Sequence, residues 1–293
     1  MVQKQMCSNQ ISMTSYSGNS QMKIMTINTH SYIENESEKK LDIFADAINR
    51  LRPDIIAMQE VNQRINEEAV EKNDIVTKQF GIRLKKDNYA LLVAQKLFQM
   101  GTKYKMVWLG IKRGFEIFDE GLCFLYKGDL QSSDAFLISK TDDIANWKKR
   151  MALSIEIGGE HFFNVHMGRW DDKEEPFIDQ WRLLDQKAKE YKKVWLMGDF
   201  NSPCDYKGEG YDSIISSNWH DTYTLAKNKD MGYTVTGSID GWRDKKFSFQ
   251  SKRIDYIFTN KKTDISSSYT VFNGENEQII SDHFGILLSY ERK

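Results

Sequence analysis

Val194-Trp195-Leu196-Met197-Gly198-Asp199-Phe200-Asn201 is a short apolar run that leads directly into a carboxylate and an amide. The apolar part, bounded by a glycine, predicts a buried strand. Ser281-Asp282-His283 is a second polar cluster, and it comes just before the last predicted strand, residues 286–290. Because burying an unpaired carboxylate or imidazole is expensive, we expect both clusters to lie at strand ends on two sides of one active site.

The segments around this stretch predict a strand-rich chain. Residues 41–51 have the i, i+3, i+4, i+7 pattern of an amphipathic helix, which Pro53 ends. This helix connects strands expected at 22–28 and 54–58. Further strands are expected at 105–109, 121–126, 151–157, 161–166, 253–258 and 286–290, with a second helix at 177–191 and about 50 irregular residues after Asn201. Such a series of elements predicts two sheets packed face to face with helices outside.

The composition fits one large domain. The 293 residues include only 3 Pro, and no linker or repeat divides the chain. We expect one domain, 22–293, after a disordered extension, 1–21, that is rich in Ser, Gln and Asn. The extension lacks the apolar stretch of roughly 7–15 residues that a signal peptide needs.

Charge and cysteine content exclude several classes of protein. The 41 Lys and Arg nearly balance the 42 Asp and Glu, which leaves no electrostatic footprint for nucleic acid or an anionic membrane. No apolar run approaches the roughly 18 residues of a membrane span. The 3 widely spaced cysteines form neither a disulfide framework nor a zinc-spaced pair, so we expect a reducing, cytoplasmic setting.

Further polar residues lie at or near predicted strand ends, and each also has a simpler explanation. Glu60 suits a metal ligand or a solvated loop start, and Asn28 suits a ligand or a turn cap. His166 is either a core histidine or a catalytic one. Asp255 lies within an apolar strand and needs a partner. We predict that Asp255 pairs with His166, the alternative being an ion pair with an Arg.

The candidates share one pattern, an oxygen or imidazole group at a strand end, and they are Asn28, Glu60, His166, Asp199, Asn201, Asp255, Asp282 and His283. Carboxylates and amides suit a hard ion such as Mg²⁺ or Mn²⁺. No Cys/His spacing suits zinc.

With these residues the chain resembles the endonuclease/exonuclease/phosphatase family of metal-dependent phosphoesterases. The matching segments are Met25-Thr26-Ile27-Asn28, Gln59-Glu60, Asn164-Val165-His166, Gly198-Asp199-Phe200-Asn201, Arg253-Ile254-Asp255-Tyr256 and Ser281-Asp282-His283. They follow the family's order from residue 22 onward. The resemblance implies a DNase I-like four-layer α/β sandwich, with two packed mixed sheets flanked by helices.

The resemblance also implies a metal site. Glu60 would bind the ion, with Asn28 and Asp282 close by. Where some nucleases of the family have an Asp two residues after the first Asn, this chain has His30. A second carboxylate is therefore missing at that point.

Catalytic roles follow from the same resemblance. Asp199 would activate or orient the attacking water, and Asn201 would position the water and the phosphate. His283 would stabilise the phosphate. His166, braced by Asp255, would protonate the leaving oxygen or stabilise the transition state.

A narrower resemblance concerns the substrate. The motifs are Asn28-Thr29-His30-Ser31, Glu120-Gly121-Leu122, His166-Met167-Gly168-Arg169-Trp170-Asp171-Asp172, Gly208-Glu209-Gly210-Tyr211-Asp212 and Ile239-Asp240-Gly241-Trp242. They are similar to the branch that contains bacterial maltose 6'-phosphate phosphatases, which implies cleavage of a phosphate monoester from a disaccharide.

Aromatic and acidic side chains in these loops suit a sugar. Trp170 with Asp171, and Trp242 with Asp240, offer an aromatic face for C–H groups and carboxylates for hydroxyls. Arg169 could grip phosphate in a forked geometry. The alternative is that the Trp residues anchor loops to the core and the Asp residues form turns.

Three other functions compete with the sugar-phosphate phosphatase. A nuclease of the same fold needs a basic groove, whereas the net charge is −1 and the one notable basic cluster is Lys148-Lys149-Arg150, which we expect to be a solvated face. A secreted sphingomyelinase needs a signal peptide. A non-enzymatic binding module predicts loss of a catalytic group, yet every matching position is occupied.

Overall fold

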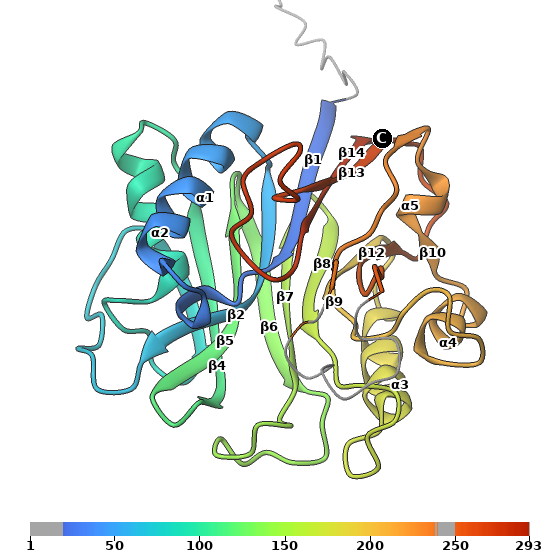
Figure 1. The fold of residues 1–293 in the computed structure, drawn as a ribbon, viewed down its shortest axis with the longest axis horizontal. Coiled ribbons are helices and arrows are strands. Elements are labelled where there is room, and N and C mark those ends of the chain that lie inside the picture. The colour runs from blue at the N-terminus through green and yellow to red at the C-terminus, as the bar shows by residue number, and fades with distance from the viewer. Residues whose placement is uncertain (1–19, 238, 240–249, 293) are drawn as a thin grey trace, which may run out of the picture.

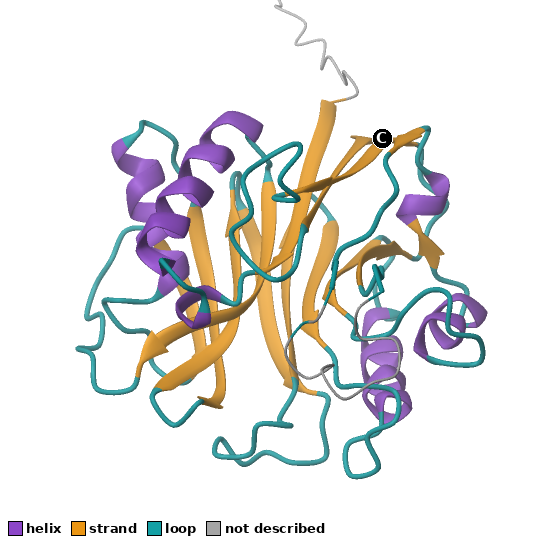
Figure 2. Cartoon of the chain, viewed as in Figure 1, coloured by secondary structure: helices purple, strands orange, loops and turns teal. Residues whose placement is uncertain are grey.

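Two β-sheets packed face to face form the centre of the molecule, and helices cover both outer faces (Figure 1). This computed structural model describes residues 20–237, 239 and 250–292. The predicted two-sheet sandwich is confirmed. Figure 2 shows the strands in the middle and the helices at the two sides.

The larger sheet contains both ends of the described chain. Its order is β11-β13-β14-β1-β2-β5-β4-β3. The strands are β1 (Ser20–Asn28), β2 (Ile55–Arg64), β3 (Val76–Gly81), β4 (Lys105–Gly114), β5 (Phe118–Tyr126), β11 (Asn228–Lys229), β13 (Ile265–Val271) and β14 (Gly285–Arg292). β1 pairs in parallel with β2 and antiparallel with β14, so the sheet is mixed.

The smaller sheet carries the quoted apolar run at its centre. Its order is β10-β12-β9-β8-β7-β6. The strands are β6 (Leu130–Leu137), β7 (Met151–Ile157), β8 (Glu160–His166), β9 (Val194–Asp199), β10 (His220–Asp221) and β12 (Asp255–Thr259). β9 pairs in parallel with β8 and antiparallel with β12, which brings the ends of three strands to one edge.

The helices bury amphipathic faces against the two sheets. They are the 3-10 helix η1 (Ser31–Ile33), α1 (Ser37–Leu51), α2 (Tyr89–Gln99), α3 (Phe177–Ala188), α4 (Gly210–Ser216) and α5 (Thr222–Leu225). Phe44 and Ile48 of α1 pack with Leu91 of α2 on the outer face of the larger sheet. Trp181 and Leu184 of α3 cover the outer face of the smaller sheet.

Apolar residues from both sheets fill the space between them. Ile24 and Leu288 of the larger sheet pack with Phe162 and Trp195 of the smaller one. Hydrogen bonds of Asn164 cross the same interface. Its side chain donates to the carbonyls of Met58 (3.0 Å) and Cys123 (2.9 Å) and accepts from Gln59 Nε2 (2.7 Å). These bonds fix β8 against β2 and β5 close to the strand ends.

The element predictions agree with the structure in the core and fail at the edges. The strand at 151–157 is β7 as predicted, and the helix at 41–51 lies within α1. Strands β3, β6 and β13 and helix α2 were not predicted. The segment after Asn201, expected to be irregular, contains α4 and α5. Among the described residues, no helix is both long and apolar enough to cross a membrane.

Candidate active site

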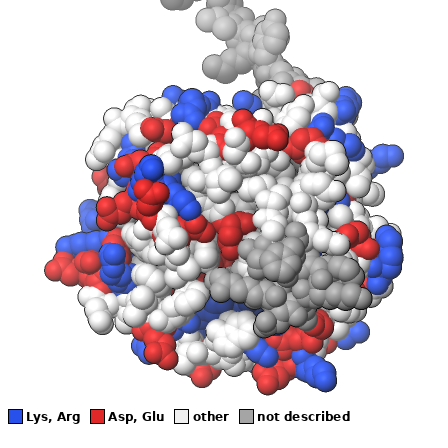
Figure 3. Space-filling model, viewed as in Figure 1, with Lys and Arg blue, Asp and Glu red and all other residues white. Residues whose placement is uncertain are grey.

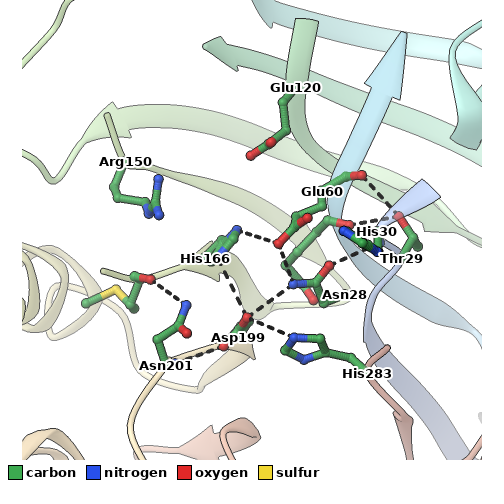
Figure 4. A network of polar contacts seen from close by, with 12 residues as sticks. Asn28, Thr29, His30, Glu60, Glu120, Arg150, His166, Asp199, Asn201 and His283 are labelled. Atoms are coloured by element: carbon green, nitrogen blue, oxygen red, sulfur yellow. Dashed lines mark hydrogen bonds and ion pairs between the residues drawn. The ribbon is translucent and has the colours of Figure 1, made fainter. Parts of the chain in front are cut away.

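Strand ends from both sheets meet at one edge of the sandwich, and their polar side chains face one another (Figure 4). Asn28 ends β1, His166 ends β8 and Asp199 ends β9. Asp255 begins β12, but because β12 runs antiparallel to β9 it lies at the same edge. The register places His166 beside Asp199, and Asp199 beside Asp255.

Glu60 reaches this edge through a bulge in β2. The pairing with β5 shifts between Met58 and Val61, and Glu60 has a φ of 50°. Side chains of a regular strand alternate between its two faces, but Gln59 and Glu60 both contact residues at the interface of the sheets. The predicted strand end after Met58 is therefore wrong, because β2 continues to Arg64 past the bulge.

Asp199 connects the polar groups of the two sheets. Its Oδ2 accepts from Asn28 Nδ2 at 3.1 Å and lies 3.6 Å from His166 Nε2 and 3.8 Å from His283 Nε2. Asn28 Nδ2 also donates to Glu60 Oε1 at 2.8 Å. A single amide therefore links a carboxylate of the larger sheet to one of the smaller sheet.

Gly198 makes room for the close strand packing before Asp199. Its φ is 145°, and a Cβ at this position would lie 1.9 Å from the carbonyl oxygen of Val165 on β8. No side chain fits there. The glycine of the Gly198-Asp199 pair thus allows β8 and β9 to bring His166 and Asp199 together.

Asp255 pairs with His283, and the predicted pairing with His166 is wrong. Its Oδ2 lies 3.0 Å from Nδ1 of His283. The physical reason is strand order, because β9 separates β12 from β8 and so places Asp199 between Asp255 and His166. Oδ1 of Asp255 is buried and has no hydrogen-bond partner among the described residues.

Asn201 is held at the edge by its backbone and its side chain. Its φ is 49°, its N–H donates to Asp199 Oδ1 at 2.8 Å, and its Nδ2 donates to the carbonyl of Met167 at 3.0 Å. These bonds turn the chain sharply after β9. Asn201 and Asp199 therefore face the same cavity.

Burial and mutual charge separate the pKa values of the site. Burial, together with the charge of Asp255, raises the pKa of Asp199 to about 7, although His283 acts in the opposite direction. Burial alone would lower the pKa of His283, but Asp255 and Asp199 hold it well above its usual value. Burial and the charges of Arg150 and Lys112 hold the pKa of His166 well below its usual value. These shifts favour the charged form of His283 and the neutral form of His166.

A cavity of about 430 Å³ opens at these side chains, a volume within the range of small-molecule sites. Glu60, His166, Asp199, Asn201 and His283 line it. So do buried charged residues that the sequence analysis did not assign to the site, namely Lys112, Glu120 and Arg150. The expectation of a solvated face for Lys148-Lys149-Arg150 is wrong for two of its members, because Lys149 and Arg150 are only 6% and 8% exposed.

Comparison with known proteins assigns the chain to a family. The model of the endonuclease/exonuclease/phosphatase family matches residues 25–283. The chain belongs to that family. No curated protein matches the sequence significantly.

Solved structures resemble this chain over more than 90% of its length. A family protein from Leptotrichia buccalis C-1013-b is 30% identical, with a TM-score of 0.81, and the match covers 92% of this chain and 100% of that one. The mannosyl-6-phosphatase Bt3783 of Bacteroides thetaiotaomicron is 17% identical with a TM-score of 0.61, over 91% and 98% of the two chains. The 3' phosphatase NExo from Neisseria, bound to a product DNA hairpin, is 16% identical with a TM-score of 0.60, over 92% and 100%.

The donor set fits a metal ion of the kind this family uses. Glu60 and Asp199 are carboxylates that share the amide of Asn28, and burial raises the pKa of both. A cation would remove the cost of their negative charge, and their oxygens with that of Asn28 suit a hard ion. Two groups of buried or half-buried acids and histidines could each hold a metal: Asp199, Asp255 and His283, and His30, Glu34 and Asp282.

Asp282 is placed by His30 and Glu34. Its Oδ1 lies 3.6 Å from His30 Nδ1, and its N–H donates to Glu34 Oε1 at 3.1 Å. His30 Nδ1 lies 2.7 Å from the same Glu34 oxygen. His30 is therefore paired with Glu34, a local acid that the sequence analysis did not identify.

The predicted substrate-binding residues are not gathered in the cavity. Arg169 lines it. Trp170 packs on Phe177 at 6.0 Å between ring centroids, as a loop-anchoring core residue does, and Asp171 is exposed. Asp240 and Trp242 lie outside the described residues.

Proposed function

We propose that the chain is a Mg²⁺- or Mn²⁺-dependent phosphomonoesterase that releases phosphate from a sugar phosphate, with maltose 6'-phosphate as its first candidate substrate. The observation that carries the proposal is the cavity around Asp199, where groups of a phosphoester-cleaving site line a space of small-molecule size. The narrower choice of substrate rests on the motif resemblance.

Charges around the cavity favour a small substrate over a nucleic acid. Lys112 is paired with Glu120 (3.1 Å), and Lys148 is paired with Asp172 (2.9 Å) and Glu174 (2.8 Å). On the face drawn in Figure 3, the basic and acidic side chains of the described residues are interspersed and form no continuous basic stripe. A nuclease would need such a stripe to follow a phosphate backbone.

The residues divide the work of an in-line displacement between them. Asp199, with a pKa of about 7, is suited to accept a proton from the attacking water near neutral pH. Asn201 positions the water, and cationic His283 stabilises the phosphoryl oxygens. His166 donates a hydrogen bond to the leaving oxygen as a neutral imidazole, since its lowered pKa keeps it uncharged, and solvent water supplies the proton that the leaving oxygen takes up. Asp255 orients His283 and favours its charged form.

A divalent ion held by Glu60, with Asn28 and Asp282 nearby, would polarise the phosphoryl group and neutralise its charge. Hydrogen bonds within the chain already orient Glu60. Asn28 orients Glu60 through its 2.8 Å hydrogen bond, and the backbone carbonyl of Glu60 accepts from Ser31 Oγ at 2.8 Å.

The test is a phosphate-release screen over sugar phosphates, with plasmid DNA and sphingomyelin in parallel. Asp199→Ala, His283→Ala and Glu60→Ala should each lower phosphate release about 100-fold or more, because each removes a group acting on the reacting centre. Asp46→Ala, at an exposed position of α1, is the matched control. Circular dichroism confirms that each variant is folded.

Chelation tests the metal separately. EDTA should stop turnover, and added Mg²⁺ or Mn²⁺ should restore it. Full activity after exhaustive chelation, or substantial activity in all three folded variants, would contradict the proposal. Rapid plasmid nicking without turnover of any sugar phosphate would assign a nuclease instead.

A further inference from the structure

Two exposed aromatic side chains stand at the cavity, and Lys148 Nζ lies 5.5 Å from the ring centroid of one of them, Trp147. Phe115, in the turn between β4 and β5, is 60% exposed, and Trp147, in the loop before β7, is 58% exposed. Both line the same cavity as Asp199 and His166. Trp is normally well buried, so an exposed indole beside a reaction centre calls for a ligand.

Buried cations hold the backbone of Trp147 in place. Its carbonyl accepts from Lys112 Nζ at 2.8 Å and from Arg150 Nη1 at 2.9 Å. The two aromatic loops are also bonded to each other, because the N–H of Arg113 donates to the carbonyl of Ile144 at 2.7 Å. The backbone that carries the indole is therefore held in place before any ligand arrives, which lowers the entropy cost of binding.

The wall between Trp147 and the reaction centre offers partners for hydroxyl groups. Glu120 is 9% exposed, and its carboxylate, paired with Lys112 through Oε1, lines the cavity. Arg150 is 8% exposed, and its Nε has no hydrogen-bond partner among the described residues. Because Arg150 lines the cavity, its guanidinium can donate to a ligand hydroxyl there.

We propose that Trp147, with Phe115 beside it, is the platform on which the sugar ring of the leaving group stacks, while Glu120 and Arg150 bind its hydroxyls. The proposal rests on the proposed function and names the part of the cavity that recognises the sugar. A pyranose has an apolar C–H face and a rim of hydroxyls, which matches an indole beside a carboxylate and a guanidinium. Trp147 thus takes the sugar-stacking role that the sequence analysis gave to Trp170, whose ring packs on Phe177.

The kinetic test compares a substrate that has a sugar ring with one that does not. In Trp147→Ala, KM for maltose 6'-phosphate should rise about tenfold with kcat nearly unchanged, because the stacking is made equally in ground and transition states. Glycerol 3-phosphate should be hydrolysed as by the parent enzyme. Trp147→Phe should restore most of the affinity, and Phe98→Ala, an exposed aromatic (55%) on α2, is the control.

A binding measurement separates this proposal from the phosphatase assignment. Calorimetry with maltose 6'-phosphate on the EDTA-treated protein should give a Kd about tenfold weaker for Trp147→Ala than for the parent chain. If this difference in Kd is found but the protein supplied with Mg²⁺ or Mn²⁺ turns over no sugar phosphate, the phosphatase is refuted and the sugar platform stands. If Trp147→Ala leaves turnover unchanged, or changes it equally for both substrates, the sugar ring does not stack on Trp147 and the proposal is overturned. Equal or absent binding would overturn it as well.

Discussion

Three residues of the site are held in the left-handed backbone region. His30, Glu60 and Asn201 have φ values of 47°, 50° and 49°. Each costs roughly 1–2 kcal/mol relative to a right-handed conformation. Hydrogen bonds offset this cost, for example those from Ser31 Oγ to the Glu60 carbonyl and from Asn201 Nδ2 to the Met167 carbonyl. These left-handed conformations turn the side chains toward the site, a direction that the backbone of a regular strand would not give them.

Gly198 gives a prediction at this scale. Gly198→Ala should destabilise the protein by more than about 3 kcal/mol, because its Cβ would meet the Val165 carbonyl oxygen at 1.9 Å and overpacking against backbone cannot relax. Gly159→Ala is the matched control, since Gly159 also has a positive φ (75°) but nothing within 4 Å of the added Cβ. Urea unfolding measures both. Equal losses in the two variants would show that the clash is relieved.

His30 and Glu34 give a pH dependence of stability. Burial opposes the charge of His30, but Glu34, Asp282 and Glu60 raise its pKa from 6.5 to about 9. Burial also opposes the ionisation of Glu34, but His30 and Lys40 lower its pKa from 4.5 to about 2. The stabilisation that His30 adds to the free energy of unfolding is complete below pH 6.5 and is lost as the pH rises through 9. The Glu34 contribution is complete above pH 4.5 and lost as the pH falls through 2.

The measurement is urea unfolding of the metal-free protein between pH 5 and 9.5. The free energy of unfolding should fall on the alkaline side, and His30→Gln should fall less steeply than the parent chain, because the variant cannot lose this proton. Parallel curves for the two proteins would contradict the assignment.

Among the elements, β8 and β14 are joined by one buried acid. Glu160, 3% exposed, begins β8 and accepts from Trp195 Nε1 (2.6 Å) and from Tyr290 OH (2.7 Å). Its other oxygen lies 3.1 Å from both Lys193 Nζ and Arg292 Nε. Because Tyr290 and Arg292 belong to β14, this carboxylate connects the two sheets at the end opposite the active site.

Glu160→Ala should therefore cost about 3–5 kcal/mol, since it leaves two cations and two buried donors without their acceptor. Glu156→Ala, on neighbouring β7, removes a partly exposed contact to Ser132 and should cost about 1 kcal/mol or less. Chemical unfolding of both variants provides the comparison. If Glu160→Ala costs no more stability than Glu156→Ala, Glu160 does not stabilise the contact between the two sheets.

The sequence predicted central elements better than peripheral ones for physical reasons. β7, β8 and β9 are buried over most of their length, and each contains a short apolar run that identifies it. β3 and β6 are edge strands with polar, half-exposed patterns, which give no such signal. α2 is apolar over most of its surface, and without polar residues at regular spacing its period is hidden.

Across the whole molecule, the site depends on how the two sheets dock. Motifs at strand ends predicted candidate residues that the structure brings to one edge, but not which of them touch, because strand order is a tertiary property. Asp255 shows this limit, since its partner is His283 and not His166. The burial of Arg150 and Lys112 and the exposure of Trp147 follow from loop packing, for which the sequence carries no periodic signal.

The domain boundary can be tested at the same scale. We propose that residues 22–293 form the catalytic domain, and β1 defines where a truncation becomes harmful. β1 lies between β14 and β2, its pairing begins at Ser20 opposite Arg292, and Ile24 and Met25 are fully buried in separate cores.

A chain that starts at Ser20 keeps every strand pair of β1, so it should match the full chain in melting temperature within about 2 °C and in phosphate release. A chain that starts at Thr26 loses the pairs from Ser20 to Met25 and both buried side chains, and it should not fold. Thermal circular dichroism and phosphate release are measured on the three proteins side by side. A lower melting temperature for the chain from Ser20 would place part of residues 1–19 in the domain, while a folded chain from Thr26 would show that the β1 ladder is dispensable.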